Sequence, residues 1–379
     1  MFRAFLIGLV LLAAACGRQE EAVQFHTEGY PETLSAWNIL NVKDANVQLT
    51  GNTHPYDLAS PLFSDYALKF RTLTLPEGTA TTYSPDATFS FPVGTIISKT
   101  FYYRSSTPRI VESANDAPFS NGRLDISGYR LIETRILARR EEGWVAFPYV
   151  WNEDQTEAKL KRVGKVIPLT YLYSNGQNNG ASSSEDNTTD FAYLVPNQNQ
   201  CAGCHATDNT SRTIEPIGLK ARHLNKASTY APAFNQLDYW QVTGILEGDF
   251  RDAHNAPRNV RWDDILTPLD DRARAYLDIN CSHCHNPVGP ADTSGLNLEP
   301  DAAGPSSGVC KNPIAAGSGS GGHQFDIVPG HPEQSIFIYR MESTDPGAMM
   351  PELGRALVHK EGVSLIREWI TSLEGDCII

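Results

Sequence analysis

Methionine, positive charge and long apolar segments are all scarce in this chain of 379 residues. Four residues are Met, and 31 Lys and Arg residues face 44 Asp and Glu residues, for a formal net charge of −13. Nucleic-acid binding is therefore not expected, because it depends on clustered positive charge. The negative charge suits a basic protein partner, and it equally favours simple solubility. Beyond the N-terminus, no apolar run is long enough to cross a bilayer.

Residues 1–16 have the pattern of an export signal. Arg3 precedes an apolar run at residues 4–15, which ends in small side chains, and Cys16 follows. We expect a lipoprotein-type signal peptide at residues 1–15 and a lipid on Cys16, so that a lipid anchor alone holds the protein on a membrane. Ordinary cleavage after Ala15 is the alternative. Both interpretations predict an extracytoplasmic location, on a periplasm-facing membrane surface or in the periplasm.

Two pentapeptides, residues 201–205 and 281–285, share the pattern C-x-x-C-H. This pattern is the signature of c-type haem attachment, in which two thiols link to one haem and the adjacent His binds its iron. The sequence therefore predicts two haem c groups, and the four linking thiols are those of Cys201, Cys204, Cys281 and Cys284. A structural zinc site and a thioredoxin-like redox motif are the alternatives. The separation of the motifs (281 − 201 = 80 residues) and the His after each pair favour haem.

The motifs also predict axial ligands of the two irons. His205 and His285 are the proximal ligands by position, and a carbonyl among residues 286–290 is expected to hold the His285 ring. Met350 is the expected distal ligand of the second haem, with Met349 or Met341 as alternatives.

The segment of the first motif contains no Met. Its distal ligand stays open between His223, His254, a group from another domain and no ligand at all. An open iron site would allow small-molecule chemistry, whereas two filled sites suit an electron carrier. His283, inside the second motif, is expected to be solvated.

Seven Cys residues are present, and two haems use four of them. Cys16, Cys310 and Cys377 remain. If Cys16 carries lipid, the other two can form a disulfide in an oxidising compartment. This assignment accounts for every thiol of the chain.

The fold class expected is multidomain α+β. Alternating apolar and polar residues predict an antiparallel β-rich sandwich or partly closed barrel at residues 24–173, followed by a flexible linker at 174–190. An atypical first haem module is expected at 191–262, with a helix near 235–246. A mainly α, cytochrome c-like domain is expected at 263–379, with helices at 268–280 and 361–373.

The chain resembles a family of bacterial dihaem c-type cytochromes, mostly uncharacterised and often encoded beside a parallel β-helix repeat protein. The segments that carry the resemblance are 91–95, 149–152, 196–200, 216–218, 272–281, 285–287, 294–296, 308–311, 327–330 and 349–355. It covers nearly the whole chain after the signal. It implies two haems, with Met350 as the Met of the Met-Pro motif, and implies no reaction or substrate.

Three functions are compatible with these features. The first is an exported electron carrier between periplasmic redox partners, for which a dehydrogenase or a terminal acceptor are candidates. The second is a peroxidase-like dihaem oxidoreductase with an open or weakly ligated first haem. The third is the redox subunit of a complex, docked to its partner through the β-rich part. The sequence favours an electron carrier over an enzyme and assigns no catalytic residue.

Overall fold

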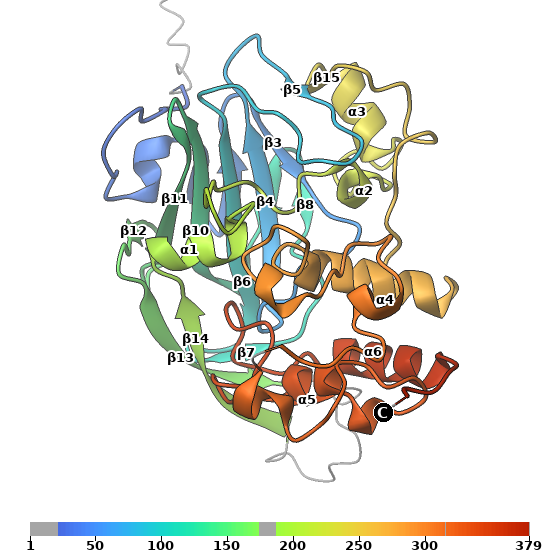
Figure 1. Cartoon of the computed structure of the whole chain (residues 1–379). Coiled ribbons are helices and arrows are strands. Elements are labelled where there is room, and N and C mark those ends of the chain that lie inside the picture. The colour runs from blue at the N-terminus through green and yellow to red at the C-terminus, as the bar shows by residue number, and fades with distance from the viewer. Residues whose placement is uncertain (1–21, 174–186, 315, 379) are drawn as a thin grey trace, which may run out of the picture.

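A computed structural model describes residues 22–173, 187–314 and 316–378 of the chain (Figure 1). It is a mixed α+β protein with a β-rich N-terminal part and several short helices later in the chain. The predicted signal peptide, Cys16 and most of the predicted linker at 174–190 lie outside the described residues. No helix within the described ranges is long and apolar enough to cross a bilayer.

The strands alternate with short turns up to Val195, and one more short strand follows later. They are β1 (Leu40–Lys43), β2 (Asn46–Leu49), β3 (Thr53–Tyr56), β4 (Leu68–Thr74), β5 (Thr81–Thr82), β6 (Ile96–Ser105), β7 (Ile110–Glu112), β8 (Phe119–Ser120), β9 (Arg123–Asp125), β10 (Tyr129–Arg140), β11 (Gly143–Trp151), β12 (Ala158–Leu160), β13 (Lys165–Leu172), β14 (Thr188–Val195) and β15 (Leu246–Glu247).

The helices are short, and most of them follow the strands. The α-helices are α1 (Gln198–His205), α2 (Ala221–Leu224), α3 (Gln236–Val242), α4 (Leu269–Leu277), α5 (Ile336–Glu342) and α6 (Lys360–Ser372). The other turns are η1 (Leu34–Trp37), the π turn η3 (Asp278–Ser282), η4 (Asp292–Ser294), η5 (Gly304–Ser307), η6 (Gly317–Ser320) and η7 (Pro332–Gln334).

The largest sheet has the order β12-β11-β10-β6-β7-β13-β14, with β4 paired to β6 and β3 to β4. All of its pairs are antiparallel except β7 with β13. The β10–β11 hairpin needs only a two-residue connection, because Arg140 pairs with Gly143 across the turn. The strand-like run expected at the start of the first haem module, 191–195, is part of β14 and so belongs to this sheet.

A second sheet, β1-β2-β9-β8, covers part of one face of the large sheet. Val47 and Leu124 of the small sheet share a buried core with Phe70, Ile136 and Phe147 of the large one. The two sheets therefore pack face to face, as in a sandwich. Among the described strands, no pairing joins β12 to β14, so the large sheet is open between these two strands.

The segment after the first motif packs on the same sheet. Leu219 and Trp240 are buried in one core with Leu73 and Phe89 of the β-rich part. The helix predicted at 235–246 is α3, which ends earlier, at Val242. The core is continuous from the sheet to this segment, so packing does not separate the two.

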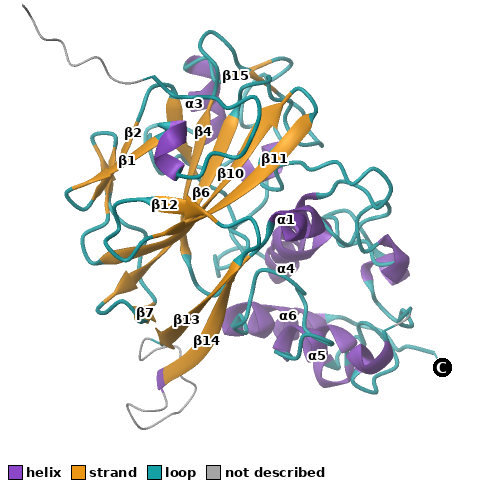
Figure 2. Ribbon diagram, turned by 90° about the vertical axis from the view of Figure 1, so that its left-hand side faces the viewer, coloured by secondary structure: helices purple, strands orange, loops and turns teal. Residues whose placement is uncertain are grey.

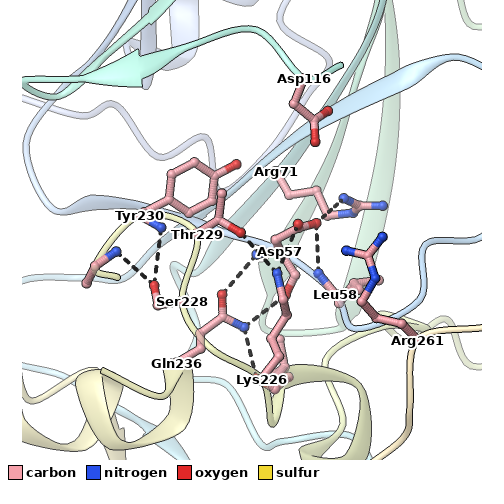
Figure 3. A network of polar contacts seen from close by, with 12 residues as sticks. Asp57, Leu58, Arg71, Asp116, Lys226, Ser228, Thr229, Tyr230, Gln236 and Arg261 are labelled. Carbon is pink, nitrogen blue, oxygen red and sulfur yellow. Dashed lines mark hydrogen bonds and ion pairs between the residues drawn. The ribbon is translucent and has the colours of Figure 1, made fainter. Parts of the chain in front are cut away.

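Polar contacts fasten this segment to the sheet as well (Figure 3). Asp57 accepts hydrogen bonds from Arg71 at 3.1 Å and from Lys226 at 3.2 Å. The Gln236 side chain accepts from the Asp57 backbone N–H at 3.0 Å and donates to its carbonyl at 2.9 Å. Arg71 is thereby supplied with a carboxylate partner from the loop that follows β3.

The C-terminal helices pack beside the sheet, on the side that also carries α1 (Figure 2). α4 and α6 share a core in which Tyr276 and Leu277 contact Ile366 and Trp369. The helices predicted at 268–280 and 361–373 are confirmed as elements, with α4 passing into η3 and α6 shifted by one residue. Pro268 occupies the N-cap of α4.

Candidate functional site

The first C-x-x-C-H motif lies on α1, a helix with a reciprocal cap at its start. The Asn197 side chain accepts the backbone N–H of Gln200 at 2.9 Å, and the Gln200 side chain accepts that of Asn197 at 2.9 Å. This capping box satisfies donors that a helix start leaves without partners. Cys201 and Cys204 stand three positions apart on the helix and so lie on one side of it. His205 is its last residue.

The second motif follows α4 through the π turn η3. Backbone N–H groups of Cys284 and His285 both donate to the Cys281 carbonyl, at 3.1 and 2.9 Å. This turn keeps the two thiols on a single bend of the chain. All four motif cysteines are free thiols.

The two motifs are neighbours in space although 80 residues separate them (281 − 201). The Cys284 thiol lies 3.7 Å from the Gly203 carbonyl, inside the first motif. The Asn209 N–H donates to the Val288 carbonyl at 3.0 Å, and the Asn209 side chain donates to Asp292 at 3.3 Å. No pattern in the sequence indicates this contact, because it depends on how distant segments pack.

A buried ion pair also joins the two motif segments. Arg222 donates to both carboxylate oxygens of Asp278, at 2.7 and 2.9 Å, and Asn259 donates to the same group at 2.6 Å. Burial opposes the charge of Asp278, but the bonds from Arg222 prevail and lower its pKa. Asp278 begins the turn that leads to Cys281, so the second motif is fixed to the segment that follows the first.

Both motifs open onto one cavity of about 630 Å³. That volume falls in the range of cofactor pockets, roughly 300–1,000 Å³. Its walls come from the sheet, α1, the α4–η3 turn, α5 and the segment before α6. The lining residues that bear on a cofactor are Lys99, Arg135, Cys201, Cys204, His205, Cys281, His283, Cys284, His285, Met341, Met350 and His359.

The two proximal imidazoles are held in the same way. Nδ1 of His205 lies 2.7 Å from the Glu215 carbonyl, which can only accept, so Nδ1 carries the proton. Nδ1 of His285 lies 3.0 Å from the Ser294 hydroxyl, which donates its own proton to the Ala291 carbonyl. Each ring therefore keeps Nε2 as the nitrogen with a free lone pair. Desolvation lowers the pKa of these rings, to about 3 and about 4 respectively, which keeps both neutral.

The partner of His285 differs from the expected one. The sequence predicted a backbone carbonyl among residues 286–290, whereas the structure uses the Ser294 hydroxyl. The Asn286 side chain instead donates a hydrogen bond back to the Ser282 carbonyl, at 2.9 Å. Ser294 is the last residue of η4, and its hydroxyl accepts a hydrogen bond from Nδ1 of His285.

Met350 lies on the wall of the cavity, on the segment between α5 and α6. Its backbone N–H donates to the Arg340 carbonyl at 2.9 Å. The buried Arg355 guanidinium donates to the Met350 carbonyl at 2.8 and 3.1 Å, and also to carbonyls of Arg340 and Ser343. These bonds fix the backbone on which the thioether stands. Met341 also lines the cavity, and Met349 is buried outside it.

The histidines considered for the first motif lie elsewhere. His223 is buried beside Asp278, with Nε2 3.7 Å from its carboxylate, and His254 is exposed. Neither lines the cavity. His283 and His359 do.

His283 corrects another expectation, because its side chain is half-buried on the cavity wall and not fully solvated. Its Nδ1 is buried without a hydrogen-bond partner within the described ranges. Desolvation, with a smaller contribution from His285, lowers the pKa of this ring to about 4. An unpartnered buried polar atom on a cavity wall is a feature that a bound group can satisfy.

His359 is enclosed by aromatic rings. It stacks on Phe63 with ring centroids 4.2 Å apart, and Trp262 meets its edge at 5.0 Å. Its Nδ1 lies 3.0 Å from the Tyr276 hydroxyl. Sequence reasoning missed His359, which occupies the N-cap of α6 and has no motif around it.

The remaining expected sites have separate places. Cys310 and Cys377 form a disulfide that ties the end of the chain to the loop before η6. Cys16 lies outside the described residues. No group of three or more His, Cys, Asp and Glu in the described ranges is arranged to hold a metal ion directly.

The donor set at the cavity fits two covalent haems. Four free thiols stand in pairs at C-x-x-C spacing, and each pair is followed by an imidazole with Nε2 available. Comparisons with known proteins add nothing to this: no family model, no curated protein and no solved structure matches the chain.

Proposed function

We propose that this chain is a dihaem c-type cytochrome that carries electrons between partner proteins outside the cytoplasm. The observation that carries the proposal is the convergence of both C-x-x-C-H motifs on one cavity. The resemblance of the motif-bearing segments to bacterial dihaem cytochromes supports it. So do the different surroundings of the two motifs, because the first packs on a β-sheet and the second follows a helix that packs on α6.

Each residue of the motifs has a role in this proposal. Cys201 with Cys204, and Cys281 with Cys284, hold one haem each, and the haems supply one-electron redox chemistry when bound. His205 and His285 present Nε2 because Glu215 and Ser294 take the other nitrogen. Met350 serves as the distal ligand of the second haem, and the hydrogen bond from Arg355 to its carbonyl fixes its backbone. A neutral thioether favours ferrous iron, so the second site would have the higher reduction potential.

The adjacency of the motifs suits electron transfer along the chain. A thiol of one motif lies 3.7 Å from a backbone carbonyl of the other, so the two attachment points are adjacent. Electrons entering at one site then need no large movement of the protein to reach the other.

Intact mass tests the proposal. Protein produced in a host with haem-attachment machinery is expected to be heavier than the bare processed chain by two haems. The double variants C201S/C204S and C281S/C284S are each expected to lose one haem, whereas C310S/C377S keeps both. A wild-type mass equal to the bare chain contradicts the proposal.

The proposal includes the membrane anchor. A lipid on Cys16 would hold the cytochrome on a periplasm-facing membrane surface, near redox partners such as a dehydrogenase or a terminal acceptor. A Cys16→Ser variant is expected to leave the membrane fraction while keeping both haems.

A peroxidase-like oxidoreductase is the second candidate. The observation that favours it is that neither His223 nor His254 reaches the cavity, which leaves the first site without an expected distal ligand. A high-spin ferric signal at one haem, and cyanide binding to it, are expected if this site is open. A wholly low-spin protein that binds no cyanide contradicts this candidate and leaves the electron carrier.

A further inference from the structure

A row of three cations crosses the sheet beside the first motif. Arg71 on β4 is directly opposite Lys99 on β6, and Lys99 is directly opposite Arg135 on β10. Directly opposed residues of neighbouring strands point to the same face. The row lines a small recess together with Cys201 and His205. With Lys69, which lines the same recess, four positive side chains are thus gathered where the sequence predicts a haem.

The two outer members of the row have carboxylate partners. Asp57 lies 3.1 Å from Arg71. Glu133, whose side chain is completely buried, accepts from Nε of Arg135 at 3.0 Å and from Nη2 at 2.5 Å. Glu133 leaves Nη1 of Arg135 available.

Lys99 differs from its neighbours. No Asp or Glu in the described ranges lies within ion-pair distance of its Nζ, which stands 5.2 Å from the Phe101 ring. Burial, and then the charges of Arg135 and Arg71, lower the pKa of Lys99 to about 7. The Lys99 side chain is half-buried, and an ammonium withdrawn from water without a counter-ion is unfavourable, so this position is suited to a bound anion.

Position identifies which anion fits. Of the row, Lys99 and Arg135 also line the large cavity, beside Cys201, Cys204 and His205. A haem linked to these two cysteines would share the cavity with these two cations. Haem carries propionate groups, and a carboxylate is the ligand that an ammonium and a guanidinium bind best.

We propose that Lys99 and Arg135 form a carboxylate-binding site for a propionate of the haem attached at Cys201 and Cys204. This inference rests on the proposed function and adds to it a role for the sheet, which becomes one wall of the first haem site. A free carboxylate such as acetate shares the same chemistry and is the other possible source of the bound group.

The test is redox potentiometry of the purified dihaem protein with optical detection. Lys99→Gln is expected to lower the midpoint potential of one haem and leave the other unchanged, because loss of a positive charge favours the ferric state. Lys99→Arg keeps the charge and is expected to restore the wild-type potential. Lys99→Met, which removes the charge but keeps the length of the side chain, serves if the Gln variant does not fold.

The matched control is Lys165→Gln, the same change at an exposed position of the same sheet. It is expected to leave both potentials unchanged. Acetate titration separates the two sources. A wild-type spectrum that does not respond to acetate supports the haem's own propionate. A response that Lys99→Gln abolishes supports a free carboxylate at the same site.

Two results overturn the inference. One is an unchanged potential in both Lys99→Gln and Lys99→Met. The other is a change of the first haem to high spin in Lys99→Arg, because it would make the Lys99 amine an iron ligand. Both results require two attached haems, so they are distinct from failure of the proposed function, which shows as a missing haem mass.

Discussion

The surroundings of the two C-x-x-C-H motifs differ in almost everything except the motif. The first lies on a capped two-turn helix whose Cys201 shares a core with the sheet residues Leu73 and Ile97. The second follows a helix packed on α6 and faces the Met350 segment. The same motif therefore occurs twice, once on a β-sheet rich in cations and once among helices beside a thioether. The environment, and not the motif, sets how the two sites differ in ligation and charge.

Loss of the Arg222–Asp278 ion pair, which links the two regions, is expected to lower the free energy of unfolding the most. Asp278→Asn leaves Arg222, whose side chain is 14% exposed, without its carboxylate. Breaking a buried pair in this way costs about 3–5 kcal/mol. Urea unfolding measures the loss, and Asp263→Asn, at an exposed pair with Arg261, is the control with little effect. Equal losses in the two variants would show that the regions are not joined by this pair.

The disulfide belongs to the second region alone. Cys310 and Cys377 are 67 residues apart, and removal of such a cross-link costs about 2–4 kcal/mol. Cys377→Ser is expected to lower the free energy of unfolding by this amount while both haems stay attached. Urea unfolding under non-reducing conditions, compared with wild type under reducing conditions, checks the effect. An unchanged stability contradicts it.

Asp65 connects the two regions with a pH dependence opposite to that of Asp278. It accepts the backbone N–H groups of Ala356 and Leu357 at 2.7 Å, and burial raises its pKa to about 6. The folded state therefore favours the protonated acid, so the free energy of unfolding falls as pH rises from about 4 to about 6.

The loss from Asp65 amounts to about 2–3 kcal/mol once the pH exceeds 6. Asp65→Asn is expected to lack this decline, and Asn also tolerates the positive φ of 50° at this position. Urea unfolding at pH 4 and pH 7.5 measures the difference, with the exposed Asp154→Asn as control. A decline of the same size in Asp65→Asn contradicts the assignment.

The smallest effect on stability is expected at Met350. The side chain is half-buried, so Met350→Ala costs about 1–2 kcal/mol. Under the proposed function, the second haem would lose its thioether and change its absorption and potential. The buried neighbour provides the contrast: Met349→Ala costs more, about 2–3 kcal/mol, and leaves the spectrum unchanged. A spectral change in Met349→Ala and not in Met350→Ala would exchange their roles.

Local patterns were predicted well from the sequence. Alternating apolar and polar residues predicted a β-rich part at residues 24–173, which contains the central strands β6 and β10, and apolar spacing predicted α4 and α6. These elements depend on side chains within one strand or helix. The predicted boundary near residue 190 has no counterpart in the sheet, because β14 pairs with β13 across it. Strand pairing is a long-range contact that periodicity does not encode.

In the candidate site, too, residues within a local motif were predicted and residues brought together by long-range packing were not. The four motif cysteines, His205 and His285 were identified from spacing alone, because haem attachment requires a fixed local arrangement of two thiols and an imidazole. His359 and Lys99 were not identified, and His223, one of the alternatives left open for the first distal ligand, does not line the cavity. Nothing within a few residues of these side chains tells which of them face the same space.

The amino-acid sequence by itself determined the chemistry that this chain can offer: paired thiols, adjacent imidazoles, and a cysteine count that leaves one pair for a disulfide. Only the tertiary structure decided that the two motifs touch, that a row of cations faces the first, and which histidines share their cavity. The physical reason is that covalent attachment needs only neighbours along the chain. A shared cavity needs the burial of apolar surface from segments far apart in sequence.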